Sequence, residues 1–249
     1  MASMSHAKII GTGSCVPQRI LSNNELEIIV DTSDKWITRR TGIKERRISA
    51  KGRGETTTDL AVHAALKAME MASISAADLD MIVVGTVTPD RQFPSAGCMV
   101  QTAIGATKAA AFDVSAGCSG FLYALTIANN GVRAQTSRLI LVLGVERLST
   151  IINWQDRSTC VLLGDGAGAV VVGPSQHGRG ILSTHLQSDG TFWDLLYSSY
   201  ERSCLPQSLD CIDLKPFQLK MDGNRLFKHA VGCLSSIASK AMEENGLST

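Results

Sequence analysis

The sequence predicts an α/β protein, because short apolar runs of strand length alternate with longer amphipathic stretches along the chain. The apolar run 110–114, for example, is followed by the small residues 115–117. The stretch 57–71 keeps Ala64 and Ala68 on one helical face and follows Thr56, a residue type that caps helices well. Of the 249 residues, 44% are hydrophobic and 19% are charged, which is enough apolar content for a sizeable core.

The same alternation locates the individual elements. The predicted strands cover residues 8–10, 81–85, 110–114, 138–145, 160–163, 167–172 and 180–185. The predicted helices cover residues 23–30, 33–40, 57–71, 95–104, 119–135 and 224–244. Residues 189–221 are the least regular segment, with Pro206 and Pro216, and they are predicted to form a long functional loop or insertion.

Charge and composition exclude several classes of protein. A net charge of +1 argues against a nucleic-acid-binding protein with a dominating basic surface. The longest apolar runs, such as 139–145, are too short to span a bilayer, and the start of the chain has no secretory-signal pattern. Seven cysteines without a CxxC pair indicate reduced thiols in a cytoplasmic protein. The five histidines show no ligand spacing, so no metal site is expected.

Cys118 is the strongest candidate for a nucleophile. It follows the predicted strand 110–114 and directly precedes the predicted helix 119–135. A thiol at the amino end of a helix lies near the positive end of the helix dipole, which favours the thiolate, and nearby amides can stabilise an oxyanion. From the residues alone, the alternative is that Cys118 is a small, inert core residue, since free cysteines are usually buried.

Several motifs occur in order over essentially the whole chain. They are the segments 9–13 (IIGTG), 31–43 (DTSDKWITRRTGI), 93–96 (FPSA), 113–121 (DVSAGCSGF), 163–169 (LGDGAGA) and 221–227 (MDGNRLF). In these motifs and their spacing the chain resembles β-ketoacyl-acyl-carrier-protein synthase III, a condensing enzyme of the thiolase superfamily whose nucleophile matches Cys118. The resemblance implies a thiolase-like layered α/β fold of two similar halves. Residues 1–174 would form the first half and residues 175–249 the beginning of the second.

The resemblance also implies a binding site for coenzyme A. The matching residues are Thr32, Trp36 and Arg40 at the nucleotide end, Arg157 on the opposite face of the adenine, and Asn224 and Phe227 along the pantetheine tunnel. Guanidinium groups suit phosphates, and both arginine and tryptophan offer flat surfaces to an adenine ring. The basic residues between Arg39 and Arg53 are otherwise interpreted as solvated surface, which would suit an acidic carrier protein.

Two further residues concern the acyl pocket. Phe93 would ordinarily be assigned to the core, but the resemblance implies an aromatic residue that crosses a homodimer interface and closes the acyl pocket of the other subunit. Leu163 stands where relatives often carry a phenylalanine near the cysteine. The glycine-rich residues 164–168 precede a β-branched run and no helix, so they are predicted to form a tight strand connection and not a phosphate loop.

The family motifs with the catalytic histidine and asparagine have no match in this sequence, which stops at Thr249. His185 is predicted at a strand end and His229 on a helix. Neither has the expected neighbours, so neither is assigned the catalytic role. The chain is therefore expected to be a shortened form that keeps the nucleophile and most of the coenzyme A contacts.

The resemblance implies an acyltransferase that starts fatty-acid synthesis. Cys118 would take an acetyl or acyl group from acyl-CoA, and malonyl-acyl-carrier protein would then condense with it in ping-pong order. Coenzyme A is a substrate in this reaction, so no cofactor is implied. Two alternatives stay open: a starter-unit acyltransferase of secondary metabolism, and a catalytically idle fragment that serves as a dimerising partner.

Overall fold

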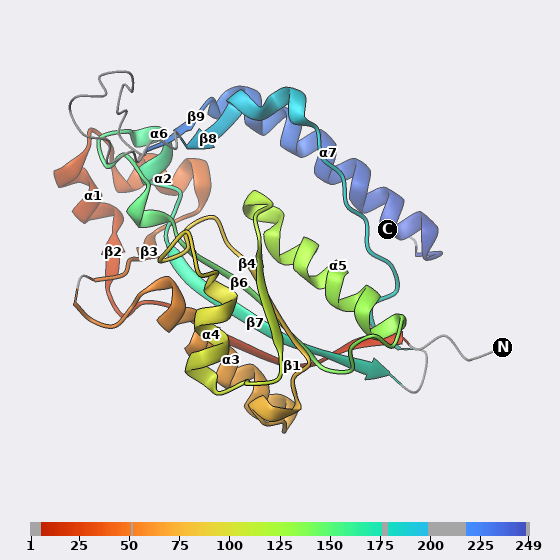
Figure 1. Cartoon of the computed structure of the whole chain (residues 1–249). Coiled ribbons are helices and arrows are strands. Elements are labelled where there is room, and N and C mark those ends of the chain that lie inside the picture. Colours follow the sequence, from red (N-terminus) through yellow and green to blue (C-terminus); the bar gives the residue numbers. More distant parts are fainter. Residues whose placement is uncertain (1–5, 51, 176–178, 199–217, 248–249) are drawn as a thin grey trace, which may run out of the picture. The chain divides into compact units, whose positions relative to one another are not determined.

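The computed structural model describes residues 6–50, 52–175, 179–198 and 218–247 (Figure 1). The chain forms two compact units that are interleaved along the sequence. The first unit comprises residues 1–20, 47–147 and 164–186, and the second comprises residues 21–46, 148–163 and 187–249. The predicted division into homologous halves at residues 174 and 175 is a different kind of boundary, and it stays a prediction.

A five-stranded mixed sheet forms the centre of the first unit. In spatial order its strands are β1 (His6–Cys15), β7 (Asp165–Ser175), β6 (Ile140–Arg147), β4 (Met81–Gly85) and β5 (Ala110–Val114). The pairs β1–β7 and β7–β6 are antiparallel, whereas β6–β4 and β4–β5 are parallel. The parallel strands therefore all end at one edge of the sheet, where the chain turns into the segments that follow β4, β5 and β6.

Helices cover both faces of this sheet. They are α3 (Thr57–Ala72), α4 (Ala96–Ile104) and α5 (Gly120–Arg133), with the 3-10 turns η1 (Ala76–Asp78) and η2 (Gly117–Ser119). One core cluster joins α3 and α4 to the strand residues Ile82 and Leu141, and a second joins α5 to the intervening residues Val83 and Val142. Because successive strand side chains point to opposite faces, α5 lies across the sheet from α3 and α4 (Figure 1).

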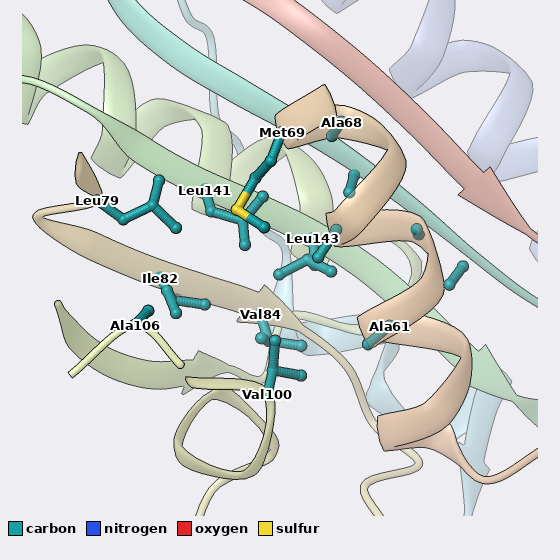
Figure 2. Close-up of a cluster of buried hydrophobic side chains, with 14 of the residues drawn as sticks. Ala61, Ala68, Met69, Leu79, Ile82, Val84, Val100, Ala106, Leu141 and Leu143 are labelled. Carbon is teal, nitrogen blue, oxygen red and sulfur yellow. The ribbon is translucent and has the colours of Figure 1, made fainter. Parts of the chain in front are cut away.

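The cluster under α3 shows why this arrangement is stable (Figure 2). Met69 of α3 packs with Leu141 and Leu143 of β6 and with Ile82 of β4 in the same apolar layer. These four side chains are buried. Burying one side chain of this size stabilises the folded state by about 1.5–3 kcal/mol. Alanine occupies many of the facing positions on α3, which lets the helix lie close to the sheet.

The second unit combines short elements with one long helix, α7 (Gly223–Glu244). The short elements are β2 (Ile20–Ser22), α1 (Asn23–Ile29), α2 (Asp34–Thr41), β3 (Glu45–Arg47), η3 (Leu148–Thr150), α6 (Arg157–Cys160), η4 (Gly190–Leu195), β8 (Leu196–Ser198) and β9 (Leu219–Met221). Strand β2 pairs with β3, and β8 pairs antiparallel with β9. In the part of the chain that the structure describes, no helix combines the length and apolar character needed to cross a membrane.

Most predicted elements are confirmed. Strands β4 and β5 and the helices α1 to α5 and α7 lie where they were predicted, with ends shifted by at most two residues. Helix α6 and the short strands β2, β3, β8 and β9 were missed, because three or four residues show no readable periodicity.

Four predictions about local structure were wrong. Residues 160–163 form the end of α6 and a turn, and residues 180–185 form no strand. Residues 164–168 are not a strand connection, because β7 already begins at Asp165 and continues through the glycines. The strand predicted over residues 8–10 is too short, because β1 extends over His6–Cys15.

The segment predicted as a long irregular loop is only partly irregular. It includes η4, β8 and β9, while residues 199–217, with Cys204 and Cys211, lie outside the described residues.

Candidate active site

Cys118 lies where β5 gives way to α5. The strand ends at Val114, and the 3-10 turn Gly117–Ser119 then leads directly into the helix at Gly120. Gly117 has a φ of 55°, a left-handed conformation that glycine adopts without a steric penalty, so the chain can turn sharply just before the cysteine. The Cys118 thiol is exposed and stands at the amino end of a fourteen-residue helix.

A close contact between helix and sheet sets the position of this turn. A Cβ atom on Gly85, the last residue of β4, would lie only 2.5 Å from the carbonyl carbon of Gly120. The first turn of α5 therefore rests directly on the backbone of β4. The glycine two residues after Cys118 is explained by this contact, which brings the nucleophile to the carboxyl-terminal edge of the parallel strands.

The second unit holds a cluster of one aromatic ring and two guanidinium groups, which we call the Trp36 cluster. The Cζ atom of Arg157 lies 4.7 Å from the centroid of the Trp36 ring, and that of Arg40 lies 5.3 Å from it. Arg157 also donates a hydrogen bond of 3.0 Å from Nη1 to the carbonyl oxygen of Asp31. Flat rings and guanidinium groups of this kind can stack on a heteroaromatic base and pair with phosphate oxygens.

The arrangement differs in one respect from the expected one. Arg157 was expected to stack on the far side of an adenine ring, and in the structure it lies directly over the indole. A base could enter between them only if the guanidinium moved away. Thr32, close by in sequence, has a buried hydroxyl oxygen with no hydrogen-bond partner among the described residues.

A buried network supports the helices that carry the Trp36 cluster. The Arg46 guanidinium donates to the carbonyl oxygen of Leu21 at 3.0 Å, to Asn23 Oδ1 at 2.7 Å and to the carbonyl oxygen of Val161 at 3.2 Å. Asn23 in turn donates from Nδ2 to Asp34 Oδ1 at 2.8 Å. The network thereby ties α1, α2, β2 and the end of α6 together.

Sequence reasoning missed this supporting role, because it assigned the basic residues near Arg46 to the surface. Arg46 is 6% exposed, and burial lowers the pKa of its guanidinium below the usual value. No pattern in the sequence could have revealed it, because Arg46 lies in a three-residue strand and its partners Leu21, Asn23 and Val161 are distant in sequence.

The remaining binding candidates are also in the second unit. Asn224 and Phe227 lie in the first turns of α7, whose amino end is capped by the Asp222 side chain. Phe227 is 71% exposed, and it continues into an exposed apolar face with Val231 and Leu234. Leu163 is partly buried just after α6. Among the residues expected to bind coenzyme A, Arg40 and Arg157 both contact the Trp36 ring.

Phe93 lies in the first unit, on the segment between β4 and α4. Its side chain is 84% exposed, so it is not the core residue that its apolar character alone would suggest. The two histidines that were not assigned a catalytic role contact nearby side chains. His185 Nε2 lies 2.8 Å from Ser183 Oγ, and the His229 ring lies 4.0 Å from that of Phe192.

No cluster of three His, Cys, Asp or Glu side chains suited to a metal ion occurs among the described residues. The described cysteines are all free thiols, and Cys118 and Cys233 are the exposed ones. Burial raises the pKa of the Cys160 thiol and of the Cys15 thiol, which makes both weaker nucleophile candidates than an exposed cysteine at a helix start.

An exposed cysteine between a parallel strand and a helix on a mixed five-stranded sheet, with helices on both faces, is the arrangement expected for a condensing acyltransferase of the thiolase fold. Comparison with known proteins supports this class. The family model described as 3-oxoacyl-[acyl-carrier-protein (ACP)] synthase III matches residues 112–190, which include Cys118. The chain belongs to the β-ketoacyl-acyl-carrier-protein synthase III family.

Relatives match along almost the whole chain. The β-ketoacyl-[acyl-carrier-protein] synthase III of Caldanaerobacter subterraneus is 50% identical over 241 residues, which cover 97% of this chain and 72% of the relative. The synthase of that name from Xylella fastidiosa strain Temecula1 is 48% identical over 248 residues, covering 99% of this chain and 74% of the relative. This chain thus spans about three quarters of their length.

Solved structures show the same fold. The crystal structure of 3-oxoacyl-[acyl-carrier-protein] synthase III from Aquifex aeolicus has a TM-score of 0.87 and 44% identity, covering 97% of this chain and 72% of that one. The priming β-ketosynthase of the R1128 polyketide pathway has a TM-score of 0.90 and 35% identity, covering 100% of this chain and 72% of that one. The predicted thiolase-like layered fold is therefore confirmed.

Proposed function

We propose that this chain takes an acyl group from acyl-CoA onto Cys118, the first half of a condensation with malonyl-acyl-carrier protein that starts fatty-acid synthesis. The observation that carries the proposal is the exposed Cys118 thiol at the amino end of α5, inside the motif that the family model matches. The Cys118 thiolate attacks the thioester carbonyl, and coenzyme A leaves as its thiolate. Amides at the start of α5 are suited to stabilise the oxyanion formed in this step.

The second half of the reaction, the condensation with malonyl-acyl-carrier protein, needs catalytic groups besides the nucleophile. In the family, a histidine and an asparagine stabilise the enolate that forms when malonyl-acyl-carrier protein loses carbon dioxide. Their motifs have no match among the 249 residues, so the residues of this chain account for the acyl-transfer half. Coenzyme A enters as part of the substrate, and we assign no cofactor. We place the protein in the cytoplasm, where its free thiols would stay reduced.

The experiment that tests this function is intact-protein mass spectrometry after mixing with acetyl-CoA. The expected result is one acetyl group per chain, released by a thiol or hydroxylamine as thioesters are. A folded chain that gains no mass would contradict the proposal and support an idle dimerising fragment. The starter-unit alternative has weaker support, because the polyketide ketosynthase is 35% identical, against 50% for the Caldanaerobacter synthase.

The Trp36 cluster is proposed to bind the nucleotide end of coenzyme A. Trp36 and Arg157 offer the two flat surfaces between which an adenine ring can stack once the guanidinium moves away from the indole, and Arg40 brings a second cation for the phosphates. The unpartnered Thr32 hydroxyl is available to hydrogen-bond the ligand. Asn224 and Phe227 are proposed to contact the pantetheine arm, and Leu163 to contribute to the acyl pocket.

Replacing the stacking arginine should weaken coenzyme A binding strongly. Arg157→Ala removes one stacking surface and one cation, which are together worth about 2 kcal/mol, so the Kd should rise about thirtyfold in isothermal titration calorimetry. Arg39→Ala is the matched control, because Arg39 is an exposed arginine on α2 outside the cluster. Equal weakening by both variants would indicate general charge attraction and refute a specific role for the cluster.

A homodimer is also proposed, with β5 at its interface. Strand β5 is an edge strand, and β4 is its one neighbour among the described strands. Ala110 and Phe112 are exposed on it. An exposed strand edge favours pairing with another chain, and a second copy of the same edge satisfies this. The exposed Phe93 on the adjoining loop would then reach the acyl pocket of the second copy.

Sedimentation velocity tests the dimer. Phe112→Lys places a charge on the exposed edge, and we expect the dissociation constant of the dimer to rise at least about a hundredfold. Leu66→Lys, at an exposed position on α3, is the control and should leave the dimer intact. A wild-type chain that sediments as a monomer, or a dimer insensitive to Phe112→Lys, would rule out this interface.

A further inference from the structure

The loop of residues 86–95 connects β4 to α4 and carries Phe93. Its central residues 91–94 are exposed, including Phe93 at 84%. A loop with such an exposed tip needs fixed ends if the tip is to hold one position. Three carboxylates that lie outside the exposed tip hold the rest of the loop in place. They belong to Glu146, Asp90 and Asp113.

Glu146 holds the beginning of the loop. Its Oε1 accepts a hydrogen bond of 2.8 Å from the Val87 amide, and its Oε2 accepts a short hydrogen bond from the Thr88 hydroxyl. The Thr88 hydroxyl oxygen also accepts a hydrogen bond of 2.8 Å from the Arg147 amide. Burial raises the pKa of Glu146, although the hydrogen bonds from Thr88 and Val87 act in the opposite direction. A partly buried carboxyl group with both oxygens engaged by one loop is a specific anchor.

Asp90 holds the middle of the loop against α3. Its two carboxylate oxygens accept hydrogen bonds from the amides of Thr57 at 2.9 Å and Thr58 at 2.7 Å, in the first turn of that helix. Arg147 Nη1 lies 3.6 Å from Asp90 Oδ1. Burial opposes ionisation of Asp90, but the hydrogen bonds from Thr58 and Thr57 outweigh it, so its pKa lies below the usual value. The loop is thereby tied both to α3 and to the end of β6.

Asp113 holds the end of the loop. Its two oxygens accept hydrogen bonds of 2.7 Å each from the amides of Ala96 and Gly97, the first residues of α4. Asp113 belongs to β5, the strand that leads to Cys118. The end of the Phe93 loop and the strand before the nucleophile are therefore joined through one side chain.

We propose that Glu146, Asp90 and Asp113 are positioning residues that hold the 86–95 loop in one conformation and so set, through Phe93, the acyl-chain preference of Cys118 in the second copy of the proposed homodimer. The inference rests on the proposed function, since it assigns Phe93 to the wall of an acyl pocket. None of the three carboxylates needs to touch the substrate. They act by restricting the position of the Phe93 ring. If this ring could move, the acyl pocket that it lines would admit acyl chains of other lengths.

The first test measures the loop itself and does not depend on activity. Thr88→Val removes the hydroxyl that links Glu146 to the loop while keeping the shape of the side chain. Hydrogen exchange of the peptide amides from residue 86 to 97 should accelerate at least about tenfold, because the hydroxyl loses its hydrogen bonds to Glu146 and from the Arg147 amide. Thr107→Val, at an exposed position after α4, should leave this exchange unchanged. Equal exchange in wild type and Thr88→Val would overturn the proposal.

The second test compares rates of Cys118 acylation by acetyl-, butyryl- and octanoyl-CoA, followed by intact mass. The ratio of octanoyl to acetyl rate should change about tenfold or more in Thr88→Val and in Glu146→Gln. In a Phe93→Ala background, Thr88→Val should cause no further change, because both act on one wall.

The outcomes separate the two proposals. Wild-type protein that takes no acyl group from any donor contradicts the proposed function, and the inference about chain preference falls with it. Wild-type protein that is acylated, with unchanged ratios in both variants, contradicts the positioning role alone. Faster exchange without a change in ratio has the same meaning, since it shows that the carboxylates only stabilise the fold.

Discussion

Cys118→Ala is expected to abolish the mass increase that acetyl-CoA produces in the wild-type chain. The thiol is the atom to which the acyl group would become bonded, so no rearrangement of neighbouring groups can replace it. The variant should remain folded, because Cys118 is exposed and its loss leaves no cavity. Circular dichroism and the unfolding midpoint should therefore match the wild type, while the acyl adduct is absent from the mass spectrum.

Two other cysteines provide controls for this result. Cys233 is exposed on α7, and Cys98 lies on α4, where its thiol is 3.6 Å from the carbonyl oxygen of Ala111. Cys233 lies in the middle of α7, and the Cys98 thiol, although in the first turn of α4, is directed at a backbone carbonyl oxygen, so Cys233→Ala and Cys98→Ala should keep the full adduct. An adduct that persists in Cys118→Ala, or disappears in Cys233→Ala, would contradict the assignment of the nucleophile.

Gly85→Ala is expected to destabilise the first unit and displace the nucleophile at the same time. The added methyl carbon would lie 2.5 Å from the Gly120 carbonyl carbon and 2.7 Å from the Phe121 amide nitrogen. These atoms belong to the backbone of α5 and cannot rotate away, so the helix start must shift. Overpacking of this kind costs about 3 kcal/mol, at the upper end of the usual range. Urea unfolding should show this loss, and acylation of Cys118 should slow.

Gly168→Ala is the matched control on the same sheet. Gly168 lies inside β7, and a Cβ atom there would meet nothing within 4 Å. Alanine is intrinsically preferred over glycine in a strand, so the unfolding free energy should stay equal or rise slightly. If both substitutions cost the same, the close contact between β4 and α5 would not be what positions the turn.

The predicted and observed elements agree where periodicity extends over several turns or a full strand. Helix α3 shows this well, since its buried alanines recur at helical spacing and Thr56 caps it as expected. The strands β4 and β5 were found with their observed bounds because each is a compact apolar run. Helix α6 was missed because four residues carry no period, and the strand predicted over residues 160–163 begins at the last residue of that helix.

The candidate site also has some features that the sequence predicted and others that only the structure revealed. The sequence places Cys118 between a strand and a helix, and the resemblance supplied Trp36, Arg40 and Arg157 as a group. The contact of both guanidinium groups with one indole became visible with the structure. Phe93 was assigned to a dimer interface by resemblance, and its exposure supports that proposal without testing it.

Local chemistry along the chain was sufficient for the α/β class, and the order of the motifs was sufficient for the family, because periodicity, turn residues and motif order are properties of neighbouring positions. Cys118 as the nucleophile stays a prediction. The roles of Arg46, Glu146, Asp90 and Asp113 depend on folding. Their partners are distant in sequence, as with Glu146 and Val87, which lie 59 positions apart. A charged residue looks the same in sequence whether it faces water or a buried amide. Its burial and hydrogen-bond partners arise when the strands and helices pack together.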